Sequence, residues 1–474
     1  MKSKSFPALL YAPLPAALLA AALAGCAVTP QLDKPVLPSA SGYTAEAVGP
    51  VGGGAVAAQK ITLGKPLDAA WWTLLKSSAL DQLVELAMKN NQTLEAARQN
   101  LAKAREETAS VRGSVGPQAT LGASAARGYN VAFAQSPGTI EGVYQVGPGL
   151  SYEVPLFGKQ QSTVAYAEAE ARRSQAELQA ALLSVSGNVV LQALEIASVS
   201  EQIRAVEIMV DSDRENLKLL QQAQAAGAIS RLDVITAQSQ LDQDSTLLPP
   251  YRERLKHAQV ALTILVGKTP AEWKAPELSL ETISLPPDLP VALPSELLHR
   301  RPDILAAEAQ MAAAGAQVGI ATANLYPQIA LTANMSVQGF LSGGSTAIWN
   351  LIGGMTMPLF DGGSLSAQKR AAEASYRAAL AQYQHTVIAA FGQVADAMYG
   401  LSSQADAMAA QQQARDSADA LYALTWQGYK NGNADYVRVL ISKRAQQQAT
   451  LALLQARKQR YEASVTLLLA TGGE

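Results

Sequence analysis

Few residues of this sequence combine the types and the spacing that enzyme or metal chemistry requires. Among its 474 residues the three histidines, His257, His299 and His385, are far apart and lack the spacing of metal ligands. The chain contains no Gly-rich phosphate loop, no HExxH pair and no nucleophile elbow. We therefore expect no enzymatic activity, no catalytic or metal-binding residues, and no cofactor apart from a covalently attached lipid.

The single cysteine, Cys26, is the residue with the clearest chemical role. It cannot form a disulfide within the chain. Two lysines and an apolar run from Ala8 to Ala24 precede it, and this is the pattern of a secretory signal peptide over residues 1–25. The Leu-Ala-Gly-Cys sequence that ends at Cys26 resembles a bacterial lipoprotein signal, which implies cleavage before Cys26 and acylation of its sulfur and amino group. The alternative is an ordinary signal peptide that contains a cysteine.

The residues that follow Cys26 predict a lipid-anchored tether. Several acyl chains anchor a protein stably, whereas one chain gives only marginal binding. Ala27 stands where an Asp would mark inner-membrane retention of such lipoproteins, so the resemblance implies delivery to the outer membrane. Residues 26–66 contain several Pro and Gly and show little periodicity, and we expect them to run as a tether over the surface.

The composition excludes several classes of protein. The chain is 49% hydrophobic and 16% charged, and its formal net charge is −2. Soluble domains usually contain about 25% charged residues, so this chain is short of charge. Its apolar content argues against disorder, and its balanced charge gives no electrostatic footprint for nucleic acid. An Ala-rich chain with few aromatic residues favours long, thin helical packing.

The remainder of the sequence is an internal duplication. Asn91–Leu121 aligns without a gap to Arg301–Leu331 at an offset of 210 residues, and Gly227 matches Gly432 at an offset of 205. A period of about 200 residues is too long for a solenoid, so we expect two copies of one unit. The predicted organisation is a first repeat at residues 67–268, a Pro-rich linker at 269–296 and a second repeat at 297–474.

Each repeat contains two stretches in which apolar and polar residues alternate with a period of two. Each stretch has about ten residues, which is the length of a tilted transmembrane strand, and this alternation is typical of a membrane barrel with apolar residues outside. A soluble four-stranded sandwich is the alternative. The predicted strands lie near residues 117–125, 144–154, 328–338 and 349–357.

In the sequence, a predicted helix precedes the first pair of strands, and very long helices follow each pair. Neither the stretch from Lys159 to Ala226 nor that from Ser364 to Lys430 contains a Pro, and a helix of this length measures about 100 Å. A shorter helix is predicted from about Leu80 to Val111. The predicted return helices run from Arg231 to about Val266, with a break at Pro249-Pro250, and from Tyr436 to about Leu469.

A Gly-centred turn joins each long helix to its return helix. The turns are Ala226–Ser230 and Asn431–Asp435; their glycines supply left-handed caps, and Ser230 and Asp435 are good N-caps. Because the side chains of these tips are small, a helix of a partner protein can contact them closely. The alternative is that they are plain turns without a binding role. The candidate tip residues are Gly227, Ser230, Leu232, Asp233, Gly432, Asp435, Tyr436, Val437 and Arg438.

Four strands cannot close a membrane barrel, and an open strand edge cannot face lipid. The chain must therefore associate with copies of itself. A dimer would have eight strands and an interior filled by side chains, whereas a trimer would have twelve and room for a lumen. The small polar residues that alternate with the apolar ones suit a water-filled lumen.

The order of elements and several motifs resemble the TolC-type outer-membrane efflux channels, specifically the lipoprotein branch that serves tripartite pumps. The most specific motif is Leu297–Ile304, which reads LLHRRPDI and is followed by Gly319–Ala321 and Tyr326-Pro327. The resemblance covers essentially residues 67–472. It implies an α+β membrane protein and a homotrimer, in which four strands per chain complete a 12-stranded barrel and the helical hairpins form a periplasmic tunnel.

The resemblance also implies partners for the hairpin tips. The tips would meet a periplasmic adaptor protein that couples the channel to an inner-membrane pump. They would also close the resting tunnel, partly through acidic residues near the level of Asp233 and Asp435. Lys443 stands where an Asp is often found, so Arg231, Arg438 and Lys443 would instead make this constriction mixed or basic.

The motif Arg300-Arg301-Pro302-Asp303 is expected to be structural. Pro302 suits the first turn of a helix, and Asp303 is favoured at its positive end. We expect the charged residues to fix the junction between the two repeats.

The sequence therefore predicts a passive, lipid-anchored efflux conduit in the cell outer membrane, with no ATP binding and no nucleic-acid partner. Drugs or other small toxic compounds, delivered by a proton-driven pump, are the leading cargo. Heavy-metal efflux and type I protein secretion are alternatives. A structural lipoprotein with a coiled-coil stalk is less favoured, because such a protein does not need a duplicated strand–helix unit.

Overall fold

The computed structural model describes residues 58–65, 67–130, 139–341 and 343–472, together with isolated positions between residues 32 and 52. Cys26 and the predicted signal peptide lie outside the described residues. The chain divides into two compact units. The first contains residues 1–36, 101–174 and 307–384, and the second contains residues 37–100, 175–306 and 385–474.

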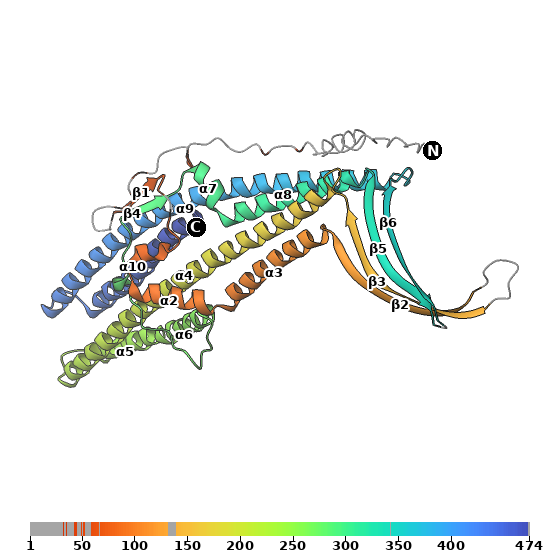
Figure 1. Cartoon of the computed structure of the whole chain (residues 1–474). Helices are drawn as coiled ribbons and strands as arrows, with labels where there is room; N and C mark the ends of the chain where they lie inside the picture. Colours follow the sequence, from red (N-terminus) through yellow and green to blue (C-terminus); the bar gives the residue numbers. More distant parts are fainter. Residues whose placement is uncertain are drawn as a thin grey trace, which may run out of the picture. The chain divides into compact units, whose positions relative to one another are not determined.

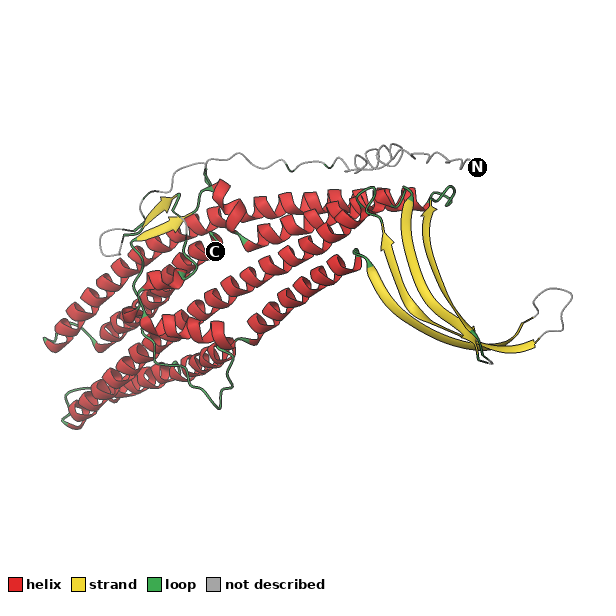
Figure 2. Ribbon diagram, in the orientation of Figure 1, coloured by secondary structure: helices red, strands yellow, loops and turns green. Residues whose placement is uncertain are grey.

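A four-stranded antiparallel sheet dominates the first unit (Figures 1 and 2). Its strands have 12 to 15 residues, and β2 and β6 are its two edges. All four predicted strands are present, in the order β2-β3-β5-β6. The strands are β2 (Gln118–Asn130), β3 (Thr139–Glu153), β5 (Gln328–Phe340) and β6 (Ser345–Thr356).

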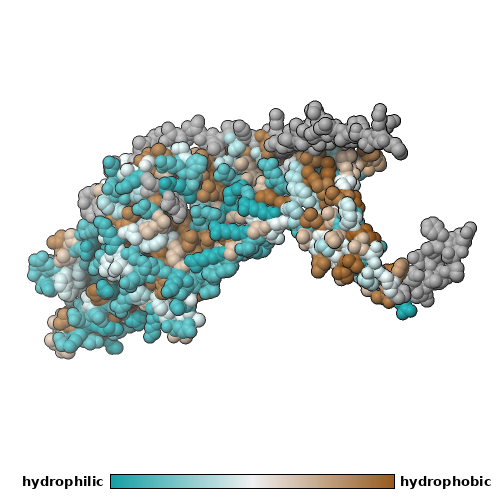
Figure 3. Space-filling view, in the orientation of Figure 1, coloured by the Kyte–Doolittle hydropathy of each residue, from teal (hydrophilic) through white to brown (hydrophobic). Residues whose placement is uncertain are grey.

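The two faces of this sheet differ in polarity, as the alternation predicts. On one face Asn334 Nδ2 donates to Asn350 Oδ1 at 3.2 Å, and Gln145 Nε2 donates to Ser336 Oγ at 3.2 Å. The other face carries exposed apolar side chains, which gather over the strands in Figure 3. They include Leu121, Val146, Leu150, Met335, Trp349, Leu351 and Met355.

A helix leads into each pair of strands. These helices, α3 (Gln92–Ser114) and α8 (Pro302–Ala323), begin 210 residues apart, as do β2 and β5. The single helix predicted from Leu80 to Val111 is wrong, because the chain is broken at Asn91 into α2 (Ser78–Asn90) and α3. Asn91 has an extended backbone, and its Oδ1 accepts hydrogen bonds from the N–H groups of Thr93 and Leu94, so it caps α3.

Two helices of 67 residues follow the strands, α4 (Lys159–Ala225) and α9 (Ser364–Lys430), and each extends over about 100 Å. The second returns through α10 (Tyr436–Ala470). The first returns through α5 (Arg231–Ser245) and α6 (Leu248–Leu265), because Pro249 and Pro250 suit only the first turn of a new helix. The predicted break is therefore present, two residues before the prolines.

Two of these helices, α4 and α8, contain an apolar stretch long enough to cross a bilayer. Length and composition alone are weak evidence, since half of that stretch is buried in α4. The strands, with their apolar face, are the better candidates for the spanning elements.

The structure corrects the predicted tether and linker at their ends. Lys60–Leu63 forms β1, which pairs in parallel with β4 (Asp288–Val291), so the predicted tether ends in a regular strand and the linker contains another. Helix α7 (Pro294–Arg300) begins three residues before the predicted start of the second repeat. Strands of four residues are too short to show a period in the sequence, and this explains why they were not predicted.

Candidate functional site: the tips of the helical hairpins

The two hairpin tips have the same backbone geometry. At the first tip (residues 226–230) the N–H of Gly227 donates to Gln224 O and the N–H of Ala228 donates to Ala223 O, both at 2.9 Å. This is the bonding pattern of a Schellman cap. The second tip (residues 431–435) repeats it through Gly432 and Asn433. The φ angles of Gly227 and Gly432 are +76° and +74°, so both positions require the left-handed conformation that glycine tolerates best.

The residues predicted as N-caps do cap the returning helices. The N–H of Asp233 donates to Ser230 Oγ, and Asp233 Oδ2 accepts from the N–H and the hydroxyl of Ser230, which together form a capping box. On the second hairpin Asp435 Oδ1 accepts from the N–H of Arg438 at 2.9 Å. Both carboxylates are therefore engaged in fixing the turns.

Aliphatic side chains project from the tips into solvent. Leu232 is 70% exposed and Val437 is 56% exposed, and they occupy equivalent positions one residue after the start of each returning helix. Ile235 and Ile441, farther along the returning helices, are also exposed. Exposed apolar side chains near a turn are candidate contacts for a partner.

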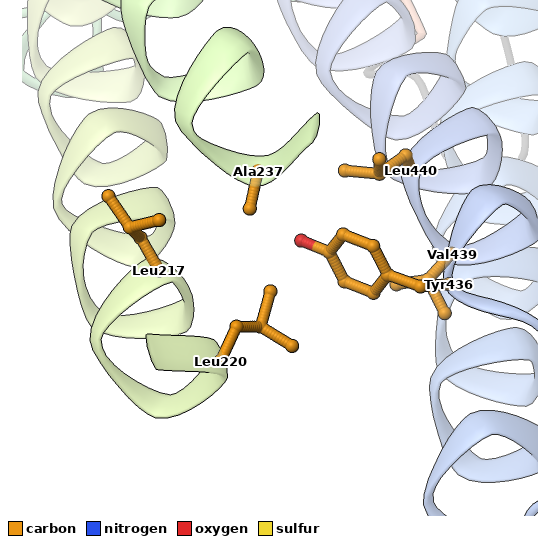
Figure 4. Close-up of a cluster of buried hydrophobic side chains, with 6 residues drawn as sticks. All are labelled: Leu217, Leu220, Ala237, Tyr436, Val439 and Leu440. Carbon is orange, nitrogen blue, oxygen red and sulfur yellow. The ribbon is translucent and has the colours of Figure 1, made fainter. Parts of the chain in front are cut away.

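Tyr436 differs from the other predicted tip residues because it is buried. It lies in a hydrophobic cluster that joins the two hairpins, and its ring points from α10 toward α4 and α5 (Figure 4). Asn216 Nδ2 donates to the Tyr436 hydroxyl, and burial raises the pKa of that hydroxyl to about 12. The cluster consists of Leu217, Leu220, Ala237, Tyr436, Val439 and Leu440.

An aromatic row on α9 continues this cluster. The ring centroids of Tyr422 and Trp426 lie 6.4 Å apart, those of Trp426 and Tyr429 lie 5.9 Å apart, and those of Tyr429 and Tyr436 lie 5.6 Å apart. Lys430 Nζ lies 5.3 Å from the Trp426 centroid, in cation–π range. The last two turns of α9 are therefore held against α10 by large, stiff side chains.

Lys443 does not contribute the exposed basic charge that was predicted. It is 6% exposed, and its Nζ lies 2.5 Å from Asp213 Oδ1 and 3.1 Å from Ser212 Oγ, both on α4. The expected mixed or basic constriction is thus wrong for Lys443, whose charge is used between the two hairpins. Arg438, by contrast, is exposed.

A second buried carboxylate, Asp244 on α5, completes this polar cluster. Its two oxygens accept hydrogen bonds from Gln240 Nε2 at 3.0 Å and from Gln447 Nε2 at 2.7 Å. Burial and the proximity of Asp244 raise the pKa of Asp213 to about 6, although Lys443 opposes this shift. The hairpins are therefore joined by a compact group of polar and titratable side chains, which adjoins the hydrophobic cluster along α10.

Asp213 and Asp244 were not among the predicted site residues. The sequence contains a signal that could have indicated the burial of their partners, since Tyr436, Leu440, Lys443 and Gln447 recur at helical spacing on one face of α10. No such signal identifies which acidic residues of α4 and α5 lie opposite.

The Arg-Arg-Pro-Asp motif forms a buried junction in the second unit. Arg301 Nη1 donates to Ala470 O at 3.0 Å and to Ala390 O, and Nη2 donates to Gln393 Oε1 at 2.6 Å. Its guanidinium also pairs with Asp303 at 2.7 Å. Pro302 and Asp303 open α8, and Arg300 ends α7. The motif joins α8, α9 and α10, and this geometry supports a structural role.

No group of three or more His, Cys, Asp or Glu that could hold a metal ion occurs among the described residues. The tip clusters consist of apolar, capping and paired charged groups.

Comparison with known proteins gives consistent matches over both repeats. The model of the family described as outer membrane efflux protein matches residues 83–268 and 293–473. The chain is 29% identical over 420 residues to the pyoverdine export outer membrane protein OpmQ of Pseudomonas aeruginosa, covering 85% of this chain and 87% of that protein. It is 28% identical over 466 residues to the outer membrane protein OprJ of the same species, covering 97% and 95% of the two chains.

A solved structure, that of the outer-membrane channel OprN, is similar with a TM-score of 0.86 and 25% identity, covering 95% of this chain and 99% of that chain. The family resemblance and the fold class predicted from the sequence are confirmed by these matches.

Proposed function

The chain belongs to the outer membrane efflux protein family, and on this basis we propose that three copies of it form a passive export conduit. It is the outer-membrane channel component of an efflux system, with helices that extend into the periplasm. In the proposed trimer, twelve strands close the barrel and the long helical hairpins form the tunnel wall. The conduit performs no chemical step of its own, so a partner pump supplies the energy.

The observation that carries this proposal is the pair of free sheet edges, β2 and β6. An open edge leaves backbone N–H and C=O groups unsatisfied in lipid, so a single chain is not stable there. Closing the sheet requires further copies of the same four strands, and twelve strands leave a lumen. The polar face, with Asn334 and Asn350, suits the lining of that lumen.

The hairpin tips are the proposed meeting point with a periplasmic adaptor protein, which connects the channel to an inner-membrane pump. Leu232 and Val437 offer the exposed apolar contacts, and the caps at Ser230 and Asp435 hold the turns in a fixed shape. The buried Tyr436 and Lys443 serve closure, because they join the two hairpins of one chain.

The proposed cargo is drugs or other small toxic compounds. Supporting this, similar proteins carry the names of a toluene efflux pump protein and a solvent efflux pump protein of Pseudomonas putida. The lipid anchor at Cys26 is likewise proposed, on the sequence pattern alone.

Drug susceptibility tests the tip assignment. A deletion strain would be complemented with the wild type, with Leu232→Glu plus Val437→Glu, or with Ile264→Glu, which makes the same change at a 64% exposed position of α6. Deletion is expected to lower the inhibitory concentration of several small toxic compounds by fourfold or more. The tip variant is expected to restore no resistance while its trimers reach the outer membrane, and the control variant is expected to restore it.

Full resistance with the tip variant would show that the tips do not dock the adaptor. If the deletion strain is sensitive only to metal salts, the cargo is metal ions instead of small toxic compounds. If the strain only fails to secrete a protein, the cargo is that protein.

A further inference from the structure

The second helical hairpin contains a cavity between α9 and α10, at a distance from its tip. The cavity has a volume of about 660 Å³ and is lined by residues 393–404 of α9 and 459–470 of α10, all within the second compact unit. Pockets that bind small molecules have volumes of about 300–1,000 Å³. Its nearest lining residue on α9, Gln404, lies about 40 Å along the helix from Lys430, where the tip begins. The cavity is therefore separate from the tip site.

The internal duplication identifies the part of the first hairpin that corresponds to this cavity. Helices α4 and α9 begin and end 205 residues apart, and α6 and α10 also end 205 residues apart. Each residue that lines the cavity therefore has an equivalent residue on α4 or α6, and the two hairpins can be compared position by position.

In the first hairpin, three long side chains fill the corresponding groove. Arg254 Nε of α6 donates to Glu195 Oε1 of α4, which forms an ion pair between the two helices. Gln192 Nε2 of α4 donates to Ala258 O of α6 at 3.1 Å. A guanidinium group and two other polar side chains thus occupy the space between α4 and α6.

The second hairpin has smaller or uncharged residues at the same three positions. Ala397, Gly400 and Gln459 replace the glutamine, the glutamate and the arginine, and all three line the cavity. A Cβ at Gly400 would meet no atom within 4 Å, so the cavity is open at this position. The cavity therefore lies where the first hairpin places an ion pair, and the guanidinium of that pair has no counterpart in α10.

The charged residues that line the cavity are acidic. Asp396 of α9 and Glu462 of α10 each supply a carboxylate, and none of the described lining residues is basic. Gln404 Oε1 is buried and has no hydrogen-bond partner among the residues that the structure describes. A buried acceptor without a donor is unfavourable, so a ligand that donates hydrogen bonds is favoured here.

A neighbouring lysine balances only part of this negative charge. Lys458 Nζ lies 3.2 Å from Glu462 Oε1 and 2.7 Å from Glu195 Oε2 of α4, so one cation is shared by two carboxylates. Asp396 is exposed along the cavity. Ala463 and Leu469 add apolar surface to the same lining. The cavity thus combines unbalanced negative charge with an apolar wall.

We propose that this cavity binds a small organic cation. Its amine, amidine or guanidine group faces Asp396 and Glu462 and donates to Gln404 Oε1, and its apolar or aromatic body lies against the alanines and Leu469. The ligand supplies the positive charge that Arg254 supplies in the first hairpin. The site is built from one chain, so it goes beyond the proposed function and does not depend on the number of copies.

Titration of the purified full-length protein with the diamidine dye DAPI tests this site, because the dye carries two amidinium groups and its fluorescence rises when it leaves water. A saturable increase with one dye per chain is expected. Benzamidine is expected to displace the dye. Phenylindole, the uncharged core of the dye, is expected not to displace it, since it lacks the amidinium groups.

Variants of the lining locate the binding. Asp396→Asn is expected to weaken dye binding by about tenfold, because a charge-assisted hydrogen bond is lost. Gly400→Glu combined with Gln459→Arg rebuilds the ion pair of the first hairpin and is expected to abolish binding. Asp416→Asn removes an exposed carboxylate from α9 outside the cavity and is expected to leave the affinity unchanged.

Three outcomes would overturn this site: no saturable binding to the wild type, equal affinities of the wild type and Asp396→Asn, or full binding by the variant with the rebuilt ion pair. The conduit is tested separately. If wild-type protein conducts ions in bilayers but does not bind the dye, the site is refuted and the conduit stands. If it binds the dye but does not conduct, only the conduit is refuted.

Discussion

Asp213 of α4 has an unusual environment for a carboxylate. It is 3% exposed, it contacts Lys443, and Asp244 lies close by. Burial and the second carboxylate together raise the pKa of Asp213 to about 6. Because an ordinary Asp has a pKa near 3.8, folding favours the protonated form of this group.

A raised folded-state pKa gives stability that is present at low pH and is lost as the pH rises through about 6. We therefore expect the hairpin contact to loosen between about pH 4 and pH 6, the interval between the unfolded and folded pKa values. Asp213→Asn mimics the neutral form and should flatten this pH dependence, which hydrogen exchange of α10 can measure. Asp416→Asn, at an exposed carboxylate of α9, should retain the wild-type dependence. The same pH profile in both variants would assign the titration to another group.

Cys26 is the second residue with a sharp prediction. If it is acylated, Cys26→Ala should remove the lipid, so that the mature protein no longer incorporates labelled fatty acid. Intact mass measures the change directly. If the masses of the wild type and of Cys26→Ala differ only by their amino-acid sequences, the wild type carries no lipid and the anchor is refuted.

At the residue scale, the sequence predicts what depends on near neighbours. The caps at Ser230 and Asp435 follow from residues within three positions, and the structure contains both. Lys443 contacts Asp213 of α4, which is 230 residues away in the sequence, so its burial could not be read from the local pattern.

The hairpin turn is the element on which the proposed site depends. At Gly432, with φ +74°, an L side chain is strained, and a Cβ in the left-handed conformation costs about 1–2 kcal/mol. Glycines within the long helices have ordinary helical backbones, and at Gly392 a Cβ would meet no atom within 4 Å.

Gly432→Ala is therefore expected to destabilise the protein by about 1–2 kcal/mol, whereas Gly392→Ala should be neutral or stabilise it by up to about 1 kcal/mol. Thermal unfolding in detergent measures both changes. The contrast matters because both substitutions add one methyl group. Similar effects at the two positions would mean that the turn does not require its left-handed residue.

Long elements were predictable from their periodicity, and short elements were not. The 67-residue helices and the strands of 12 or more residues match the predicted periodicity. The break at Asn91 was missed because its side chain caps α3 inside an uninterrupted apolar pattern. Strands β1 and β4 were missed because each has only four residues. They are stabilised by pairing with each other, although they are far apart in the sequence.

At the scale of the whole molecule, the kinds of element explain the composition, and the duplication bears on the oligomer. The 16% charged fraction is low because strands with an apolar face and closely packed Ala-rich helices need few charges. In a ring of copies, contacts between the two repeats of one chain alternate with contacts between neighbouring chains. The ring therefore needs only one kind of contact between chains. The sequence identifies the repeats, but the register in which they pair within the chain, β3 against β5, is visible only in the structure.

Single-channel recording in planar bilayers tests most directly whether this protein is a passive conduit. Purified trimers should insert and give discrete ion-conducting steps, which become larger or longer in Tyr436→Ala because the cluster that joins the hairpins is lost. Inserted trimers that carry no current, in the wild type and in Tyr436→Ala alike, would contradict the conduit.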